Sequence, residues 1–406
     1  MDAFTTPSNW QRVRLGDVAE IIGGGTPSTQ ITSFWNGSIN WFTPTEIGIT
    51  KYVYKSQRTI TLLGLKKSSA KLLPIGTILL TSRASIGDCA ILKVVATTNQ
   101  GFQSLIPLEK INNEFLYYLM LTLKNKLLKL ASGSTFLEVS PNKIKNLLIP
   151  LPPLNEQIAI ANILSGLDRY LYSLDALILK KESVKKALSF ELLSQRKRLK
   201  GFNQAWQRVR LGDIGITISG LVGKTKQDFI NGNAKYITFL NVLNNFIIDT
   251  SILENVKIYP NEKQNSFKKY DLFFNTSSET PKEVGMCAVL LDDIDQVFLN
   301  SFCFGFRIFD KAVDGLFLSY LINSEIGRKA FENLAQGSTR YNLSKSGFNN
   351  VCLFLPPLNE QIAIANILSD LDSEIISLKN KKRQFENIKK ALNHDLMSAK
   401  IRVLNK

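Results

Sequence analysis

The segment LPPLNEQIAIANILS at Leu151–Ser165 recurs letter for letter at Leu355–Ser369, an offset of 204 residues. A second segment, WQRVRLGD at Trp10–Asp17, recurs unchanged at Trp206–Asp213, an offset of 196 residues. Internal repetition is the most informative feature that a sequence can carry, because each copy normally forms one structural unit. The chain is therefore expected to contain two copies of one folding unit.

The stretches between the repeated segments have diverged. Residues 18–129 and 214–333 share little sequence, although identical segments frame them. A recent tandem duplication alone would leave the bodies about as similar as the frames. Identical frames around divergent bodies favour a chain that docks the same partner twice, while its two bodies bind two different things.

Composition and charge point to a polyanionic partner. The chain has 406 residues, more than one ordinary core, and 50 Lys and Arg against 34 Asp and Glu, a net charge of +16. Such a charge favours nucleic acid, with an anionic membrane surface as the competing interpretation. The absence of a long apolar stretch or a signal peptide argues against membrane insertion and secretion. Cys89, Cys287, Cys303 and Cys352 lie far apart and are typical of small hydrophobic residues in a reducing cytoplasm.

Each copy is predicted to be a mixed α/β body followed by helices. Short apolar runs between turn signals predict strands, and longer amphipathic runs predict one helix in each body that stops at a Gly-Ser-Thr loop. The predicted strands are 76–83, 89–95 and 102–108 in the first body and 271–278, 287–291 and 304–309 in the second; the predicted helices are 114–131 and 315–335.

The segments after the repeated Pro-Pro pairs predict two helices in each copy. A short helix begins near Asn155 or Asn359, with Ile158, Ala161 and Leu164 as its buried stripe. A long helix follows over 167–200 and 371–404, where apolar residues recur near heptad spacing. The two long helices are expected to form an antiparallel coiled coil with pseudo-two-fold symmetry, a rod of roughly 50 Å. Their basic tails suit DNA contact and a solvated charged face equally well.

The expected fold class is therefore α+β, with two mixed α/β domains in tandem, each followed by a helical region. The expected boundaries are 1–150 for the first body, 151–200 for the first helical docking region, 201–354 for the second body and 355–406 for the second helical docking region.

Motifs for catalysis are missing from the sequence. GKT at Gly223–Thr225 lacks the glycine that a phosphate-binding loop needs five positions earlier, where Ile218 stands. The Pro-Pro pairs are flanked by leucine, so the polar residue and aromatic ring of an adenine methyltransferase motif are absent. The single histidine, His394, lies in a lysine-rich helical tail, and no residue cluster suggests a metal. The chain is expected to have no catalytic centre.

Two variable bodies, each followed by LPPLNEQ and helices, resemble the specificity subunit of Type I restriction-modification systems. The resemblance covers essentially the whole chain, and the doubled LPPLNEQIAIANILS is its most specific element. It implies that each body is a target recognition domain that binds one half of a bipartite, asymmetric sequence of double-stranded DNA, while the helices set the unread spacer. It also implies two methyltransferase subunits that hold S-adenosylmethionine, and two motor-nuclease restriction subunits that use ATP and Mg²⁺. No cofactor is expected in this chain itself.

Candidate site residues follow from this organisation. Phosphate contacts position a protein on DNA and contacts to base edges specify the sequence, so polar loop residues of the bodies are the candidates. The DNA-binding candidates are Thr26, Ser28, Thr45, Ser82, Arg83, Asn99, Gln100, Ser134 and Thr135 in the first body, and Lys224, Thr276, Ser277, Asn300, Ser338, Thr339 and Arg340 in the second. The two Ser-Thr pairs are shared by the bodies and favour phosphate contact. The candidates for docking the methyltransferase are Glu156, Gln157, Glu360 and Gln361, for which packing against the body is the alternative.

Three other functions compete with this interpretation. A coiled-coil scaffold with incidental basic charge would not shift random duplex DNA even at low salt. An enzyme that acts on nucleic acid alone would methylate or cleave DNA as a purified chain. A protein that binds anionic membranes fits the α/β bodies poorly.

Overall fold

The computed structural model describes residues 7–133, 137–332, 334, 337 and 340–403. The chain divides into two compact units. Unit 1 comprises Met1–Asp175 and Asn380–Lys406, and unit 2 comprises Ala176–Lys379. Each unit therefore contains one α/β body together with parts of both long helices.

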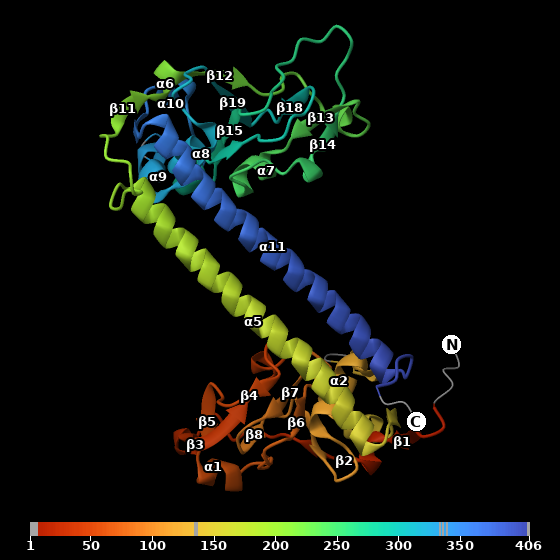
Figure 1. Cartoon of the computed structure of the whole chain (residues 1–406). Helices are drawn as coiled ribbons and strands as arrows, with labels where there is room; N and C mark the ends of the chain where they lie inside the picture. The colour runs from red at the N-terminus through yellow and green to blue at the C-terminus, as the bar shows by residue number, and fades with distance from the viewer. Residues whose placement is uncertain (1–6, 134–136, 333, 335–336, 338–339, 404–406) are drawn as a thin grey trace. The chain divides into compact units, whose positions relative to one another are not determined.

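The body of unit 1 is built on a five-stranded sheet and a three-stranded sheet (Figure 1). The first has the order β2-β9-β6-β7-β4 and the second the order β5-β3-β8. Their strands are β2 (Ala19–Gly23), β9 (Gln103–Pro107), β6 (Ile78–Leu80), β7 (Cys89–Leu92), β4 (Tyr52–Val53), β5 (Arg58–Ile60), β3 (Trp35–Phe42) and β8 (Ala96–Thr98). The predicted strands 76–83, 89–95 and 102–108 are thus confirmed.

The body of unit 2 has a four-stranded sheet in the order β12-β19-β15-β17 and a three-stranded sheet in the order β14-β13-β18. Their strands are β12 (Gly215–Ser219), β19 (Cys303–Ile308), β15 (Leu272–Asn275), β17 (Cys287–Val289), β14 (Glu254–Val256), β13 (Ala234–Ile237) and β18 (Val297–Leu299). A small ladder joins β16 (Ser277–Ser278) to β20 (Tyr341–Asn342). The strands predicted for this body are confirmed as well.

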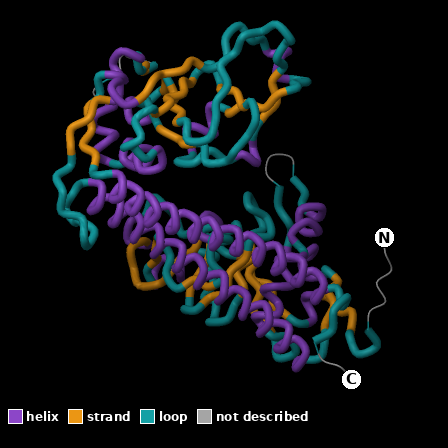
Figure 2. Tube along the Cα trace, turned by 45° about the horizontal axis from the view of Figure 1, so that its top comes forward, coloured by secondary structure: helices purple, strands orange, loops and turns teal. Residues whose placement is uncertain are grey.

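The two bodies share one topology despite their different sequences. In the larger sheet β12, β19, β15 and β17 take the places of β2, β9, β6 and β7, and in the smaller sheet β14, β13 and β18 take those of β5, β3 and β8. The bridge of Ile247 to Val289 is parallel, like the pairing of β4 with β7. In each unit, loops make up much of the chain (Figure 2).

The repeated segments meet in space within each unit. β1 (Gln11–Arg14) pairs antiparallel with β10 (Leu148–Leu151) in unit 1, and β11 (Gln207–Arg210) pairs with β21 (Cys352–Leu355) in unit 2. The framing sequence WQRVRLGD therefore lies beside the strand that leads into LPPLNEQ. Its repetition is explained by a ladder that closes each body.

The helix predicted in each body is interrupted. Instead of one helix over 114–131, unit 1 has α2 (Asn113–Thr122) and α3 (Lys124–Leu130), and unit 2 has α8 (Gly315–Asn323) and α9 (Glu325–Glu332). Ser324 adopts an extended backbone after α8, and its hydroxyl accepts a hydrogen bond from the N–H of Gly327 over 3.3 Å, which starts α9. The remaining helices are α1 (Leu62–Lys66), α4 (Pro141–Lys145), α6 (Leu211–Ile214), α7 (Phe239–Asn244) and α10 (Lys345–Asn349).

Two long helices follow the bodies, α5 (Leu154–Leu193) and α11 (Leu358–Met397). The prediction of a short helix followed by a separate long helix is wrong, because each helix is uninterrupted through the expected break near Leu167 and Leu371. Gly166 lies inside α5 with open space around the position of a Cβ atom. A single interior glycine costs only about 1 kcal/mol, which is too little to end a packed helix.

The two helices run antiparallel in both units. In unit 1, Asp168 of α5 forms an ion pair with Lys389 of α11, and Asp175 forms one with Lys382 at 2.6 Å. Residue numbers therefore increase along α5 as those of its partners in α11 decrease. In unit 2, Lys185 of α5 pairs with Asp372 of α11 at 2.5 Å. These parts of the helices lie side by side in Figure 1. The predicted antiparallel pairing is confirmed within each unit.

The predicted apolar stripe is largely correct. The positions predicted at heptad spacing are all buried or half-buried: Leu167, Leu171, Leu174, Ile178, Leu188 and Leu192 in α5, and Leu371, Ile375, Leu378, Phe385, Leu392 and Leu396 in α11. Ile158 is the exception in the predicted short helix, because its side chain is 41% exposed, while Ala161 and Leu164 are buried. Cys89, Cys287 and Cys303 are buried as expected, Cys352 is half-buried, and His394 is exposed.

Candidate nucleic-acid interface

Four of the predicted DNA-binding residues of unit 1 meet around the turn between β8 and β9. The carbonyl oxygen of Gly101 accepts hydrogen bonds from the N–H and the hydroxyl of Ser82, at 2.8 and 3.2 Å. The Asn99 side-chain oxygen accepts a bond from the Gly101 N–H at 2.9 Å. The Thr26 hydroxyl donates to the Gln100 side-chain oxygen. We call these residues, with Gly24 and Gly101, loop cluster 1.

The glycine run Gly23-Gly24-Gly25 does more than mark a turn. A Cβ atom on Gly24 would lie 1.9 Å from the carbonyl oxygen of Asn99, so only glycine allows the loop to approach this turn. Two buried tryptophans hold the loop that follows Gly24 by hydrogen bonds to its backbone. The indole of Trp41 donates to the carbonyl of Gly25 at 2.9 Å, and the indole of Trp35 donates to that of Ser28 at 3.0 Å.

The other predicted residues of unit 1 flank loop cluster 1. Thr45 is exposed, and its hydroxyl lies 3.0 Å from that of Thr43. Arg83 forms an ion pair with Glu138 at 2.8 Å. Ser82 is only 1% exposed, so its hydroxyl fixes the loop and is not free to contact a base.

Unit 2 repeats the hydrogen bonds that fix this turn. The carbonyl oxygen of Phe302 accepts hydrogen bonds from the N–H and the hydroxyl of Thr276, at 2.9 and 2.8 Å. The Asn300 side-chain oxygen accepts a bond from the Phe302 N–H at 2.9 Å. A Cβ atom on Gly220 would lie 2.3 Å from the carbonyl oxygen of Asn300. We call these residues, with Val222 and Ser301, loop cluster 2.

The side chains on the shared backbone differ between the clusters. Phe302 takes the place of Gly101, and Ser301 that of Gln100. The loop that carries Thr26 in unit 1 carries Val222 in unit 2, because Gly25 and Leu221 make the same 2.8 Å bond to the strand beside them. Loop cluster 1 therefore presents an amide and a hydroxyl, whereas loop cluster 2 presents an exposed phenyl ring and an exposed isopropyl group. Arg340 is exposed, with its guanidinium 5.7 Å from the centre of the Phe302 ring.

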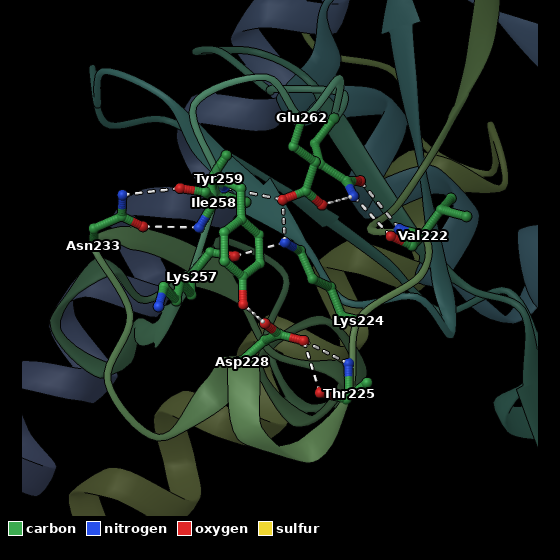
Figure 3. A network of polar contacts seen from close by, with 10 residues as sticks. Val222, Lys224, Thr225, Asp228, Asn233, Lys257, Ile258, Tyr259 and Glu262 are labelled. Atoms are coloured by element: carbon green, nitrogen blue, oxygen red, sulfur yellow. Dashed lines mark hydrogen bonds and ion pairs between the residues drawn. The ribbon is translucent and has the colours of Figure 1, made fainter.

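Lys224 is held inside its own loop (Figure 3). Its ammonium group donates to Glu262 at 2.5 Å and to the carbonyl of Lys257 at 2.6 Å, and its side chain is only 5% exposed. Hydrogen bonds from Lys224, from Gln264 and from the backbone N–H of Tyr259 lower the pKa of Glu262 to about 2. Asp228 accepts bonds from the N–H and the hydroxyl of Thr225, both at 2.8 Å. Lys224 thus orders the loop that carries Val222. Its ammonium group is already paired with Glu262 and is not available to a ligand.

The remaining predicted DNA-binding residues separate into two groups. Ser277 is buried in β16. Ser134, Thr135, Ser338 and Thr339 lie outside the described residues.

The four predicted docking residues are buried, each no more than 2% exposed. The Gln157 side-chain oxygen accepts from the N–H of Asn112 at 2.8 Å, and its amide donates to the carbonyls of Lys110 and Pro152 at 3.1 and 2.8 Å. Gln361 makes the equivalent bonds in unit 2. Glu156 accepts from Arg402 at 2.8 Å, and Glu360 accepts from Arg198 at 2.7 Å. All four side chains fasten the start of a long helix to its body.

The same helical segment exposes a stripe that the sequence analysis missed. Asn155, Ile158 and Asn162 are exposed in α5, and their copies Asn359, Ile362 and Asn366 are exposed in α11. Their spacing of three and four residues places them on one face of each helix. Packing inside a unit does not require surface residues to be identical. The identity of the two copies was visible in the sequence, but their exposure was not.

Comparison with known proteins places this architecture. The family described as "Type I restriction modification DNA specificity domain" matches residues 7–181 and again residues 203–387. The chain belongs to this family. Members of this specificity family are generally non-catalytic, in keeping with the motifs missing from the sequence.

Individual relatives agree with the family. The Type I restriction enzyme MjaIX specificity subunit of Methanocaldococcus jannaschii is 31% identical over 303 residues, which cover 70% of this chain and 69% of that protein. The MjaVIII specificity subunit of the same organism is 27% identical over 428 aligned residues, covering 100% of this chain and 96% of the relative. A crystal structure of the Type I restriction-modification S subunit from M. genitalium matches with a TM-score of 0.60 at 17% identity, covering 98% of each chain. This likeness shows that the fold is shared.

The described residues include neither a metal-binding cluster nor a membrane-spanning helix. No group of three or more His, Cys, Asp and Glu side chains is placed there to hold a metal ion. Within the same part of the chain, none of the helices combines the length and the apolar character needed to cross a membrane.

Proposed function

We propose that each of the two bodies binds one half of a bipartite, asymmetric sequence of double-stranded DNA. The observation that carries this proposal is the pair of loop clusters, which have one backbone arrangement and different side chains. Identical readers related by a two-fold axis would favour a palindromic site, whereas unlike readers favour an asymmetric one. The net charge of +16 would supply attraction to phosphates that does not depend on sequence.

The long helices connect the two readers and set the number of unread base pairs. Both are continuous for 40 residues, and ion pairs between them occur in both units. Such a braced pair is suited to fix a distance. Inserting a heptad near Leu174, with a matching insertion in α11, is expected to lengthen the spacer or abolish binding while both half-sites keep their bases.

The chain would act as the recognition subunit of a larger assembly in the cytoplasm. Two methyltransferase subunits, which hold S-adenosylmethionine, would dock on the two repeated segments, and two restriction subunits would add ATP- and Mg²⁺-dependent cleavage. The burial of Glu156, Gln157, Glu360 and Gln361 supports a role in orienting the helices for docking. The exposed stripes around Ile158 and Ile362 would provide the surface that touches the partner.

The decisive experiment maps methylated adenines in DNA exposed to the chain reconstituted with its methyltransferase. Replacing residues 18–150 with those of another family member should change the bases of one half-site and leave the other half and the spacer unchanged. A change in both halves would contradict the assignment of one body to each half. Failure of the wild-type complex to bind duplex DNA, even at low salt, would favour the scaffold interpretation.

A further inference from the structure

Phe302 lies at the tip of loop cluster 2, where its apolar side chain is exposed to solvent. Its ring is 54% exposed, although the surrounding backbone is fixed on both sides by the bonds to Thr276 and Asn300. A large ring on a mobile loop can fold back onto the protein, whereas a ring on a braced turn stays where the turn directs it. The braced turn therefore keeps the Phe302 ring in solvent.

The equivalent position in loop cluster 1 has no side chain at all. Gly101 makes the same two backbone bonds as Phe302, with Ser82 and Asn99 as partners. The turn therefore folds without an aromatic residue, so Phe302 is not needed to build it. Single exposed rings are common on protein surfaces, so the case for a contact outside the chain rests on the braced turn and on the groups around Phe302.

The surroundings of Phe302 favour a nucleic acid base as that contact. Arg340 lies beside the ring and adds a positive charge that suits a phosphate or a base edge. Val222, on the loop ordered by Lys224, is 67% exposed, and its N–H and carbonyl are both bonded to the Gln264 side chain, at 3.1 and 2.7 Å. Apolar side chains on rigid loops next to a cation are typical of wedges that unstack or cover bases.

Building on the proposed function, we propose that Phe302 packs its ring against the bases of the half-site bound by unit 2, as a stacking wedge that unit 1 lacks. Unit 1 would read its half-site through the Gln100 amide and the Thr26 hydroxyl, by hydrogen bonds. Unit 2 would combine stacking by Phe302 with apolar contact by Val222. The two half-sites would then be distinguished by the kind of contact as well as by the bases.

The test uses the complex of the full chain with its methyltransferase and a duplex that contains the mapped site. F302A should weaken binding of this duplex by about 10- to 100-fold, since aromatic stacking on a base is worth about that much. F302W, which keeps the ring surface, should bind within about threefold of the wild type. 2-Aminopurine placed along the half-site of unit 2 should brighten at one step with the wild-type complex and stay dark with F302A.

Phe309 provides the matched control. It is 59% exposed, but it follows the far end of β19, about 20 Å along the strand from Phe302. F309A should leave both affinity and 2-aminopurine fluorescence unchanged.

Three outcomes would overturn the inference. In the first, the wild type binds its site specifically and F302A binds equally well. In the second, F302A loses the methyltransferase subunit, which would show that the ring contacts protein. In the third, the wild-type complex does not bind DNA specifically, and the proposed function fails together with this inference.

Discussion

Trp10 donates a hydrogen bond from its indole Nε1 to the carboxylate of Glu156 over 3.0 Å. The bond joins the two segments that recur unchanged in the sequence, WQRVRLGD and LPPLNEQIAIANILS. Its counterpart is missing in unit 2, where the indole nitrogen of Trp206 is buried without a hydrogen-bond partner in the part of the chain that the structure describes. Identical segments thus have different bonding, although each glutamate also accepts two bonds from an arginine, Glu156 from Arg402 and Glu360 from Arg198.

This difference predicts unequal effects of one substitution made twice. W10F and W206F remove the same atoms from buried sites, but only W10F removes a hydrogen bond to a charged acceptor. W10F should therefore destabilise its unit by about 1–2 kcal/mol more than W206F. Amide hydrogen exchange of β1 and β11, measured separately, reports the two local stabilities. Equal losses would show that the bond to Glu156 adds no stability.

The exposed stripe makes a prediction about partner docking. I158S should reduce the number of methyltransferase subunits bound per chain from two to one, and I158S combined with I362S should abolish binding, because both variants remove an exposed apolar anchor. Native mass spectrometry of the complex gives the count. Q157A is the contrasting variant, since it should weaken the start of α5 in hydrogen exchange while two partners still bind. Loss of partners only in Q157A would return the docking surface to the buried polar residues.

Much of this architecture could be predicted from local pattern. Short apolar runs between turn signals located the strands of both bodies, and the heptad spacing found the buried face of α5 and α11. The break expected near Leu167 does not occur, because α5 is continuous from Leu154 to Leu193. The helix at this point is held by packing, with Leu164 and Leu174 buried on either side, and this packing offsets the low helix propensity of one glycine.

The site was harder to predict, because burial of polar residues depends on distant parts of the chain. Glu156 and Gln157 look like surface residues in the first turn of a helix, and nothing nearby in sequence reveals that Arg402 and Asn112 bond to them. Asn99 and Asn300 were identified independently as loop residues. Only the structure shows that they make the same bond in twin turns, and that Phe302 occupies the position of Gly101.

Glu262 predicts how the loop of Lys224 responds to acid. Its pKa is lowered from 4.5 to about 2 in the folded chain, chiefly by the hydrogen bond from Lys224. A depressed carboxyl pKa contributes stability that is fully present above the unfolded value and is lost as pH falls toward the folded value. The advantage of the wild type over E262Q should therefore be constant near neutral pH and shrink between about pH 4.5 and pH 2. Hydrogen exchange of residues 221–230 across this range measures it, and a pH-independent difference would contradict the ionic role of Glu262.

The two arginines that bind the buried glutamates predict that the chain tolerates circular permutation. In unit 2, Arg198 bonds to Glu360 and donates to the carbonyl of Gln204 at 2.8 Å. Gln204 lies two residues before Trp206. In unit 1, Arg402 bonds to Glu156 in the same way and donates to the side-chain oxygen of Asn9 at 3.1 Å, beside Trp10. The segment after each arginine therefore lies close to the tryptophan that begins a body, although only in unit 2 is this link covalent.

A copy of residues 199–205 should consequently be able to link Arg402 to Trp10, in place of the residues after Arg402 and before Trp10. The permuted chain would carry this joint and be opened after Lys200, next to Gly201, an exposed residue in a left-handed conformation with φ of 95°. It should melt within about 5 °C of the original, because the buried core residues of both units are kept and the copied Leu199, which packs against the core of unit 2, takes the place of Val403 in unit 1. Its complex should also methylate the same sequence. As a control, the same joint with an opening between Leu174 and Asp175 interrupts α5 at a buried position and should fail to fold. If the chain opened after Lys200 fails in the same way, the covalent link from Arg198 to Trp206 has a role that the non-covalent contact of Arg402 with Asn9 cannot replace.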